Sequence, residues 1–241
     1  MFIKNLKLFN FKNHSEKSFD FSPEINCFVG NNGAGKTNIL DALHYLSMAK
    51  SFLGNLDAQN ILHESDFFAI EAEIQGEEKN DIIKVQLPKE GKKIIKKNDK
   101  TYERIADHIG FLPSVMISPY DANLISDGSE SRRKFLDAMI SQTDSDYLFA
   151  LIQYQKTLQQ RNALLKYFAK NRTFDLDSLE IYNEPLTKFG TQIFEKRQRF
   201  VASILPTIQH FYEIISKGNE KVTVIYESNL NEQNFEEILS E

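Results

Sequence analysis

One short stretch constrains this chain more than any other. Residues 30–37 read Gly-Asn-Asn-Gly-Ala-Gly-Lys-Thr, which matches the pattern G-x-x-x-x-G-K-[ST]. The glycines let the backbone turn tightly and approach an anion without an intervening Cβ. The backbone N–H groups of such a loop point inward and form an anion nest. The predicted phosphate-binding residues are Gly30, Asn31, Asn32, Gly33, Ala34, Gly35, Lys36 and Thr37.

The last two loop residues specify the ligand. Lys36 carries a compact positive charge that suits the β- and γ-phosphates of a nucleotide. The hydroxyl of Thr37 is a hard oxygen ligand of the kind that Mg²⁺ accepts. The motif therefore predicts binding of ATP together with Mg²⁺, with Thr37 as the metal ligand.

The residues around the loop have the order that this motif needs. Ile25, Cys27, Phe28 and Val29 form a short apolar run that predicts a buried strand, in which Cys27 is expected to pack. After the loop, Ile39, Leu40, Leu43 and Leu46 recur at helical spacing and predict a helix to about Ala49. The N-terminus of this helix would point toward the phosphates. Asp41 and His44 are expected on its solvated outer face.

Composition excludes several classes of protein. The formal net charge of −5 excludes an overall basic nucleic-acid binder but allows local basic faces. The one cysteine permits no intramolecular disulfide. The N-terminus lacks a signal-peptide pattern, and no apolar run approaches the ~18 residues of a membrane helix. We therefore expect a soluble, cytoplasmic protein with no membrane partner.

The first half of the chain predicts strands and the second half predicts helices. Strands are expected over residues 2–11, around Phe19 and Phe21, and over 67–74, 82–87, 94–97, 101–104 and 115–117. Helices are expected over 130–141, 146–169 and from 178 to about 215, with a kink or break at Pro206. The last two helices would form an antiparallel arm, and residues 222–226 a strand that returns to the sheet.

These elements suggest an α/β fold: a mixed sheet around the phosphate-loop helix, with an inserted lobe that carries the helical arm. The expected domains are an ATP-binding lobe over 1–117, a helical lobe over 118–220, and the start of a return to the first lobe over 221–241. The sequence allows two roles for each of two basic clusters: a solvated or structural role, or contact with DNA or a partner. The first cluster is Lys89, Lys92, Lys93, Lys96, Lys97 and Lys100, and the second is Arg132, Arg133 and Lys134.

Two motifs of a nucleotide hydrolase are missing from the sequence. No apolar strand ends in a pair of acids, and no Ser-Gly-Gly signature loop is present. We therefore expect this chain to be the N-terminal portion of a longer protein and to contain no catalytic residue of its own. An ATP-binding protein without catalysis is the alternative.

Several segments together resemble the RecF family of bacterial DNA replication and repair proteins. They are Leu-Phe-Asn-Phe-Lys-Asn-His at 8–14, the loop and helix at 30–52, Ser-Pro-Tyr-Asp at 118–121, Ser-Arg-Arg-Lys-Phe-Leu-Asp at 131–137, and 154–165 with Gln160, Arg161 and Asn162. The resemblance implies a P-loop head of the ABC-type ATPases of the SMC group. It also implies that Lys12 and Asn13 lie near the nucleotide, although a turn-forming Asn and a solvated Lys are the alternative.

The resemblance further implies an ATPase that forms an ATP-dependent homodimer and binds double-stranded and gapped or junction DNA. RecR and RecO would be its partners in loading RecA during DNA repair, replication restart and the SOS response. Other hypotheses are the head of another SMC-like or OLD-type ABC ATPase, a small-molecule kinase, and an interaction module without nucleotide. The intact Lys36 and Thr37 argue against the last, and the absence of an acceptor site and lid argues against the kinase.

Overall fold

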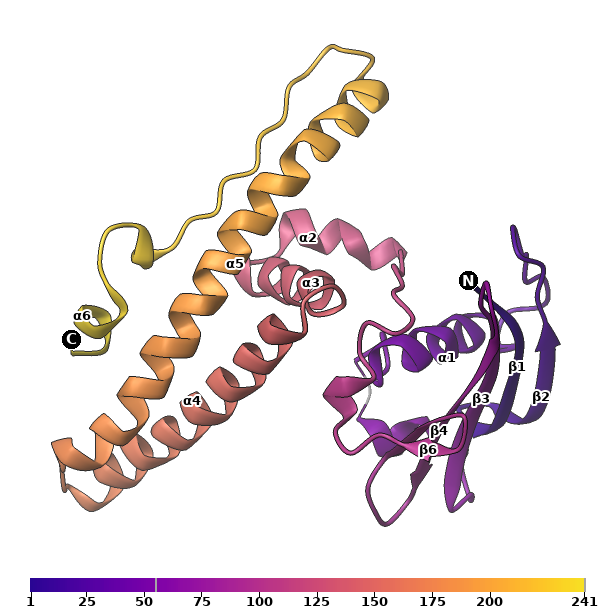
Figure 1. Ribbon diagram of the computed structural model, residues 1–241, viewed down its shortest axis with the longest axis horizontal. Coiled ribbons are helices and arrows are strands. Elements are labelled where there is room, and N and C mark those ends of the chain that lie inside the picture. Colours follow the sequence, from indigo (N-terminus) through magenta and orange to yellow (C-terminus); the bar gives the residue numbers. More distant parts are fainter. Residues whose placement is uncertain (55, 241) are drawn as a thin grey trace. The chain divides into compact units, whose positions relative to one another are not determined.

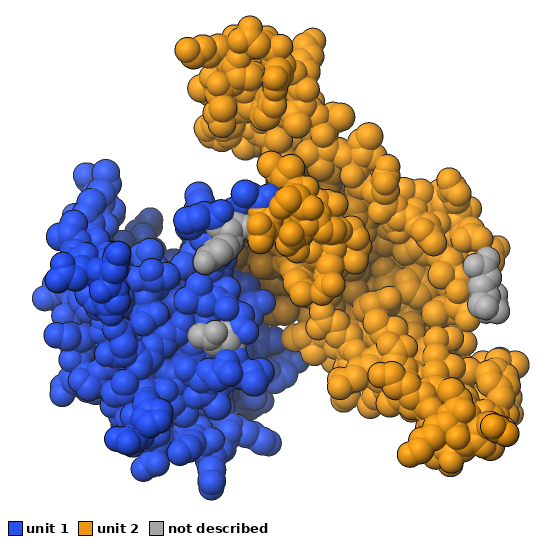
Figure 2. Space-filling model, turned by 180° about the vertical axis from the view of Figure 1, so that it is seen from behind, with its two compact units in different colours: residues 1–122 blue, residues 123–241 orange. Residues whose placement is uncertain are grey.

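The protein divides into two compact units. The computed structural model describes residues 1–54 and 56–240, with residues 1–122 in one unit and 123–241 in the other (Figure 2). The division falls after Ala122, slightly later than the expected boundary at residue 117. Residues 221–240 group with the second unit, and the expected return of this segment to the first lobe stays a prediction.

The first unit is an antiparallel sheet with one long helix (Figure 1). The strand order is β2-β1-β3-β4-β5-β6, and every pairing in this order is antiparallel. Short 3₁₀ turns cover 57–60, 105–107 and 119–122. The elements are β1 Phe2–Phe11, β2 His14–Asp20, α1 Lys36–Met48, β3 Phe67–Gln75, β4 Asn80–Pro88, β5 Ile94–Lys97 and β6 Lys100–Thr101.

Alternating side chains build the core of this unit. Apolar residues on one face of β1, β3, β4 and β5 pack against α1, as the period-two pattern of residues 67–74 predicts. Three rings, Phe11, Tyr45 and Phe68, meet edge to face with centroids 5.3–6.1 Å apart. Burial of one face of α1 holds the N-terminus of this helix beside the C-terminus of β1. These two termini belong to the site described below.

The lysines of 89–100 do not share one environment. Lys93 Nζ lies 2.7 Å from Asp57 Oδ2 and 4.9 Å from the Tyr45 ring centroid. Lys97 Nζ lies 3.2 Å from Asp81 Oδ2 and 3.6 Å from the Phe111 ring centroid. These two lysines therefore stabilise the unit. The predicted hairpin is confirmed, and a role in DNA contact stays a prediction for the remaining four lysines.

Three predicted strands are wrong. The structure has no strand over residues 25–29, 115–117 and 222–226. Ile25, Val29 and Ile117 are 82%, 91% and 81% exposed, and Cys27 is exposed as well. An apolar run forms a strand only where a neighbouring strand accepts its backbone hydrogen bonds, and no strand in the described part of the chain pairs with these segments.

A buried histidine makes the first unit sensitive to acid. His108 is fully buried, and its Nε2 donates to the Leu46 carbonyl oxygen at 2.6 Å. Its Nδ1 has no hydrogen-bond partner among the described residues, so protonation would place an unpaired donor in the core. Burial lowers the pKa of His108 below its ordinary value of 6.5, and burial also lowers the pKa of His44.

We predict that the unfolding free energy of this unit falls as the pH drops below 6.5, because the unfolded chain then binds a proton that folded His108 does not. The slope is at most about 1.4 kcal/mol per pH unit for each histidine. Urea titrations from pH 7.5 to 5 measure it. His108→Gln keeps a donor but does not titrate, so it should reduce the slope. An unchanged slope would contradict the assignment to His108.

The second unit is helical and contains the predicted arm (Figure 1). Helices α4 and α5 pack side by side along the arm and connect through residues 172–175. Pro206 lies inside α5, which continues to Ser216, so the helix does not break there, and a kink at Pro206 stays a prediction. The helices are α2 Asn123–Ser126, α3 Ser129–Ser141, α4 Ser145–Asn171, α5 Leu176–Ser216 and α6 Phe235–Ser240.

Ion pairs join the base of the arm to α3. Arg197 on α5 donates to both carboxylate oxygens of Asp137 at 2.6–2.9 Å, and the Tyr147 hydroxyl donates to the same carboxylate. Asp144 accepts from the Tyr147 N–H at the start of α4 and pairs with Lys196 at 2.6 Å. These contacts hold α3, α4 and α5 together. Within the described chain, no helix has both the length and the apolar character needed to cross a membrane.

Candidate nucleotide-binding site

The phosphate-loop sequence lies between the β1–β2 hairpin and α1. Gly35 is the N-cap of α1 and has φ +91°, a left-handed conformation that favours glycine. A Cβ at this position would lie 2.5 Å from His14 Nε2 and 2.6 Å from Asn13 Oδ1. Residue 35 must therefore be glycine both for its backbone angle and for the close approach of the hairpin.

The start of α1 has the features of an anion site. No side chain caps the N-terminus of α1, and its first turn contains no acidic residue. Free N–H groups and the helix dipole at such an end favour a negative group. Lys36 Nζ donates to the carbonyl oxygens of Gly30 at 2.8 Å and Asn31 at 2.9 Å, which keeps its charge at the loop. Thr37 is exposed in the first turn.

The β1–β2 turn contacts the loop directly. Asn13 Nδ2 donates to the Gly33 carbonyl oxygen at 3.1 Å, and Asn38 Nδ2 donates to Asn13 Oδ1 at 2.8 Å. His14 Nε2 lies 3.2 Å from the Gly35 carbonyl oxygen, and because a carbonyl only accepts, this nitrogen is the donor. The structure thus brings Asn13, His14 and Asn38 to the loop, and contact between Asn13 and a nucleotide stays a prediction.

Lys12 is held differently from Asn13. Its Nζ lies 2.6 Å from Asp41 Oδ2, and the two side chains are 8% and 0% exposed. Asp41 also accepts from the Ser51 hydroxyl at 2.8 Å and from the Phe52 N–H at 2.7 Å. Lys12 is therefore not solvated, and contact between Lys12 and a nucleotide stays a prediction.

The expectation for Asp41 and His44 is wrong. Asp41 is fully buried, and His44 is partly buried with its ring edge-on to Phe52. Both residues face the segment that follows α1 instead of the solvent. Sequence reasoning also missed His14, Asn38 and Ser51. The signal that could have revealed Asp41 is its position directly before Ala42, inside the apolar face of the helix.

The second basic cluster is engaged locally. Arg132 Nη1 donates to the carbonyl oxygens of Leu124 at 3.0 Å and Asp127 at 2.9 Å, which ties α2 to α3. Arg133 Nη1 donates to Ser129 Oγ at 2.7 Å, and Lys134 pairs with Glu130 at 2.7 Å. These contacts support a structural role, and contact with DNA or a partner stays a prediction for this cluster.

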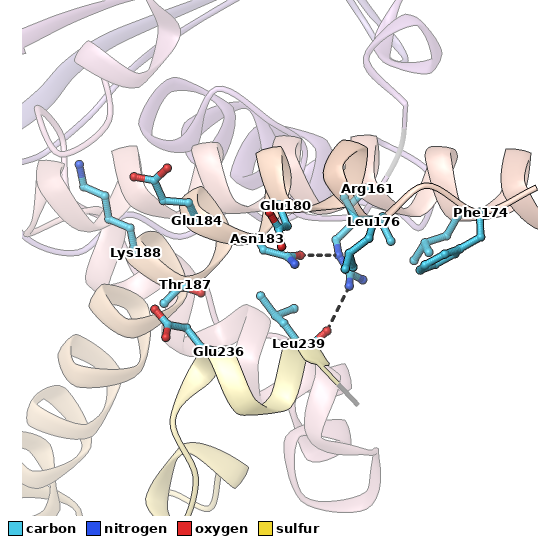
Figure 3. A pocket seen from close by; sticks show the side chains of 12 residues that line it. Arg161, Phe174, Leu176, Glu180, Asn183, Glu184, Thr187, Lys188, Glu236 and Leu239 are labelled. Atoms are coloured by element: carbon cyan, nitrogen blue, oxygen red, sulfur yellow. Dashed lines mark hydrogen bonds between the residues drawn. The ribbon is translucent and has the colours of Figure 1, made fainter.

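Arg161, from segment 154–165 of the resemblance, lines a pocket in the helical unit (Figure 3). Its Nε donates to Asn183 Oδ1 at 3.0 Å and its Nη2 to the Leu239 carbonyl oxygen at 3.4 Å. The pocket encloses about 830 Å³ between α4, α5 and α6. Arg161 thus links the arm to the segment that ends in α6.

Comparison with known proteins first defines the class. Residues 5–241 match the family described as AAA domain. Two solved structures of the recombination mediator protein RecF in the RecFOR pathway have the same fold. The RecF-ATPrS structure has a TM-score of 0.90 and 31% identity over 99% of this chain and 64% of that chain. The RecF-ATP structure has a TM-score of 0.89 and 30% sequence identity, over 99% of this chain and 66% of that chain. The fold and loop are those of a P-loop ABC-type ATPase head.

Curated relatives then define the family. The chain is 51% identical to the DNA replication and repair protein RecF of Flavobacterium johnsoniae over 100% of this chain and 67% of the relative. It is 46% identical to the protein of the same name from Phocaeicola vulgatus, over 95% of this chain and 61% of that relative. The chain belongs to the RecF family and spans about two thirds of the length of these relatives.

Proposed function

We propose that the protein binds Mg-ATP through residues 30–37 as part of a DNA replication and repair ATPase. The observation that carries this proposal is the loop itself: Gly35 caps α1 in a left-handed conformation, and Lys36 is held beside it. ATP and ATPrS appear in the names of the two solved RecF structures with TM-scores near 0.9, which supports the same ligand here.

The role of each group follows from its chemistry. The N–H groups at the start of α1 would bind the phosphates, and Lys36 would exchange the Gly30 and Asn31 carbonyl oxygens for phosphate oxygens. Thr37 would give Mg²⁺ one hydroxyl ligand, with phosphates and water completing the shell. Among the described residues no cluster of His, Cys, Asp and Glu could hold a metal, so Mg²⁺ would arrive with the nucleotide.

The wider function rests on family membership. We infer that the intact protein hydrolyses ATP, forms an ATP-dependent homodimer, and binds double-stranded and gapped DNA. RecR and RecO would be its partners in loading RecA, and the cytoplasm its compartment. ATP would favour the closed dimer and so change DNA affinity, which is a population shift between two states. Names such as "DNA replication and repair protein RecF" and "RecFOR pathway" support this proposal.

Calorimetric titration tests the ATP binding on which the proposal depends. Titration of the protein with ATP in the presence of Mg²⁺ should saturate well below millimolar nucleotide. Retention of gapped DNA on a filter should rise with ATP but not without nucleotide. An absence of heat and of saturation at millimolar ATP would overturn the proposal.

A further inference from the structure

We propose that the β1–β2 turn is a brace that holds the phosphate loop in its binding conformation, with Asn13, His14 and Asn38 as positioning residues. This inference rests on the proposed ATP binding at residues 30–37. The three side chains contact the loop or each other, so the brace consists of the protein's own hydrogen bonds.

The geometry of a peptide group gives the brace its effect. The C=O of one residue and the N–H of the next lie in one plane and point in opposite directions. Asn13 holds the Gly33 carbonyl, and therefore sets the direction of the Ala34 N–H. The Gly35 carbonyl accepts from His14 Nε2 and from the Ile39 N–H at 3.1 Å, and the two bonds together set the direction of the Lys36 N–H. The turn holds the loop by its carbonyl oxygens, which directs the Lys36 N–H away from the turn. The Ala34 N–H donates to the Asn31 carbonyl oxygen at 3.3 Å and would exchange this acceptor for an anion.

The brace is itself anchored on both sides. Lys12 has a left-handed backbone with φ +53°, and its N–H donates to the Asn60 carbonyl oxygen at 2.7 Å. Its ammonium pairs with buried Asp41 on α1. The turn is thus tied to the helix that carries the loop, and Gly35 has no Cβ that would push the turn away. A preorganised site loses less entropy when a ligand binds.

Asn13→Ala is the decisive variant, because Asn13 is exposed and its loss leaves the core intact. Each neutral hydrogen bond contributes enough to change an equilibrium about 3- to 10-fold. We expect the Kd for ATP to rise by about this factor. The Kd for inorganic triphosphate should rise equally, because the brace acts on the phosphates. Asn38→Ala should have a smaller effect in the same direction, since Asn38 acts through Asn13.

Hydrogen exchange of residues 30–37 without nucleotide gives a second readout. Asn13→Ala should accelerate the exchange of these amides. Substitution of a residue that contacts only the nucleotide would leave the exchange rate unchanged. The matched control is Asn5→Ala. Asn5 lies on β1 and donates to Ser18 Oγ and Asp20 Oδ1 across the same hairpin, and among the described contacts none joins its side chain to the loop. Asn5→Ala should leave both Kd values and the exchange of the loop unchanged.

The outcomes separate the two proposals. Weaker ATP binding with unchanged triphosphate binding and unchanged exchange would overturn the brace, because Asn13 would then contact the nucleoside. No effect on any readout would overturn it as well. If the unmodified protein binds neither ATP nor triphosphate, the proposed function fails, and the exchange of the free loop still decides whether the brace exists.

Discussion

Lys36→Ala should raise the Kd for ATP by about 10- to 100-fold, the loss expected when hydrogen bonds from a charged group to phosphate disappear. The ammonium group donates two hydrogen bonds to the loop, and both acceptors belong to exposed residues. Its loss should therefore leave the fold unchanged. Calorimetry with Mg-ATP measures the first effect and a thermal melt the second.

The matched control is Lys17→Ala, which removes the same charge from exposed β2. Nucleotide binding by this control should equal that of the unmodified protein. In the intact repair protein, Lys36→Ala should also abolish the retention of DNA that depends on ATP. Undiminished retention would refute the role assigned to Lys36, even if the binding measurements agreed with it.

Local patterns predicted the elements that fold by local rules. The period of two in residues 67–74 gave β3, and the loop motif gave the start of α1, because each signal comes from neighbours in the sequence. The arm was predictable for the same reason, since α4 and α5 are long and amphipathic. The predicted strand over residues 25–29 was wrong because an apolar run indicates only a preference for burial. It does not indicate which other strand would pair with it.

The site was predictable only in part. The motif named residues 30–37, and the resemblance brought Lys12 and Asn13 to attention. Asp41 was missed because a carboxylate inside a helix ordinarily faces water. Its burial depends on Lys12, 29 positions earlier, and on Ser51 and Phe52 after the helix ends. Such a set of partners is a property of the tertiary fold, and no spacing rule in one sequence describes it.

Asp41→Asn should lower the unfolding free energy of the first unit by about 3–5 kcal/mol, the cost of leaving a buried charge without its partner. The amide keeps the size of the side chain and an oxygen for the Phe52 N–H. It removes the charge beside the Lys12 ammonium, which is 8% exposed and has little access to water. Urea unfolding followed by hydrogen exchange of residues 36–48 and 67–75 reports on this unit alone.

The double variant Asp41→Asn with Lys12→Met separates the ion pair from the rest of the site. It removes both charges, so no uncompensated ion remains, and its destabilisation should be well below that of Asp41→Asn alone. Glu71→Gln is the control at a partly exposed ion pair: Glu71 lies 3.5–3.8 Å from Lys7 and Lys84, and its loss should cost under about 1 kcal/mol. If Asp41→Asn changed stability no more than this control, the buried pair would not fix the turn that holds the phosphate loop.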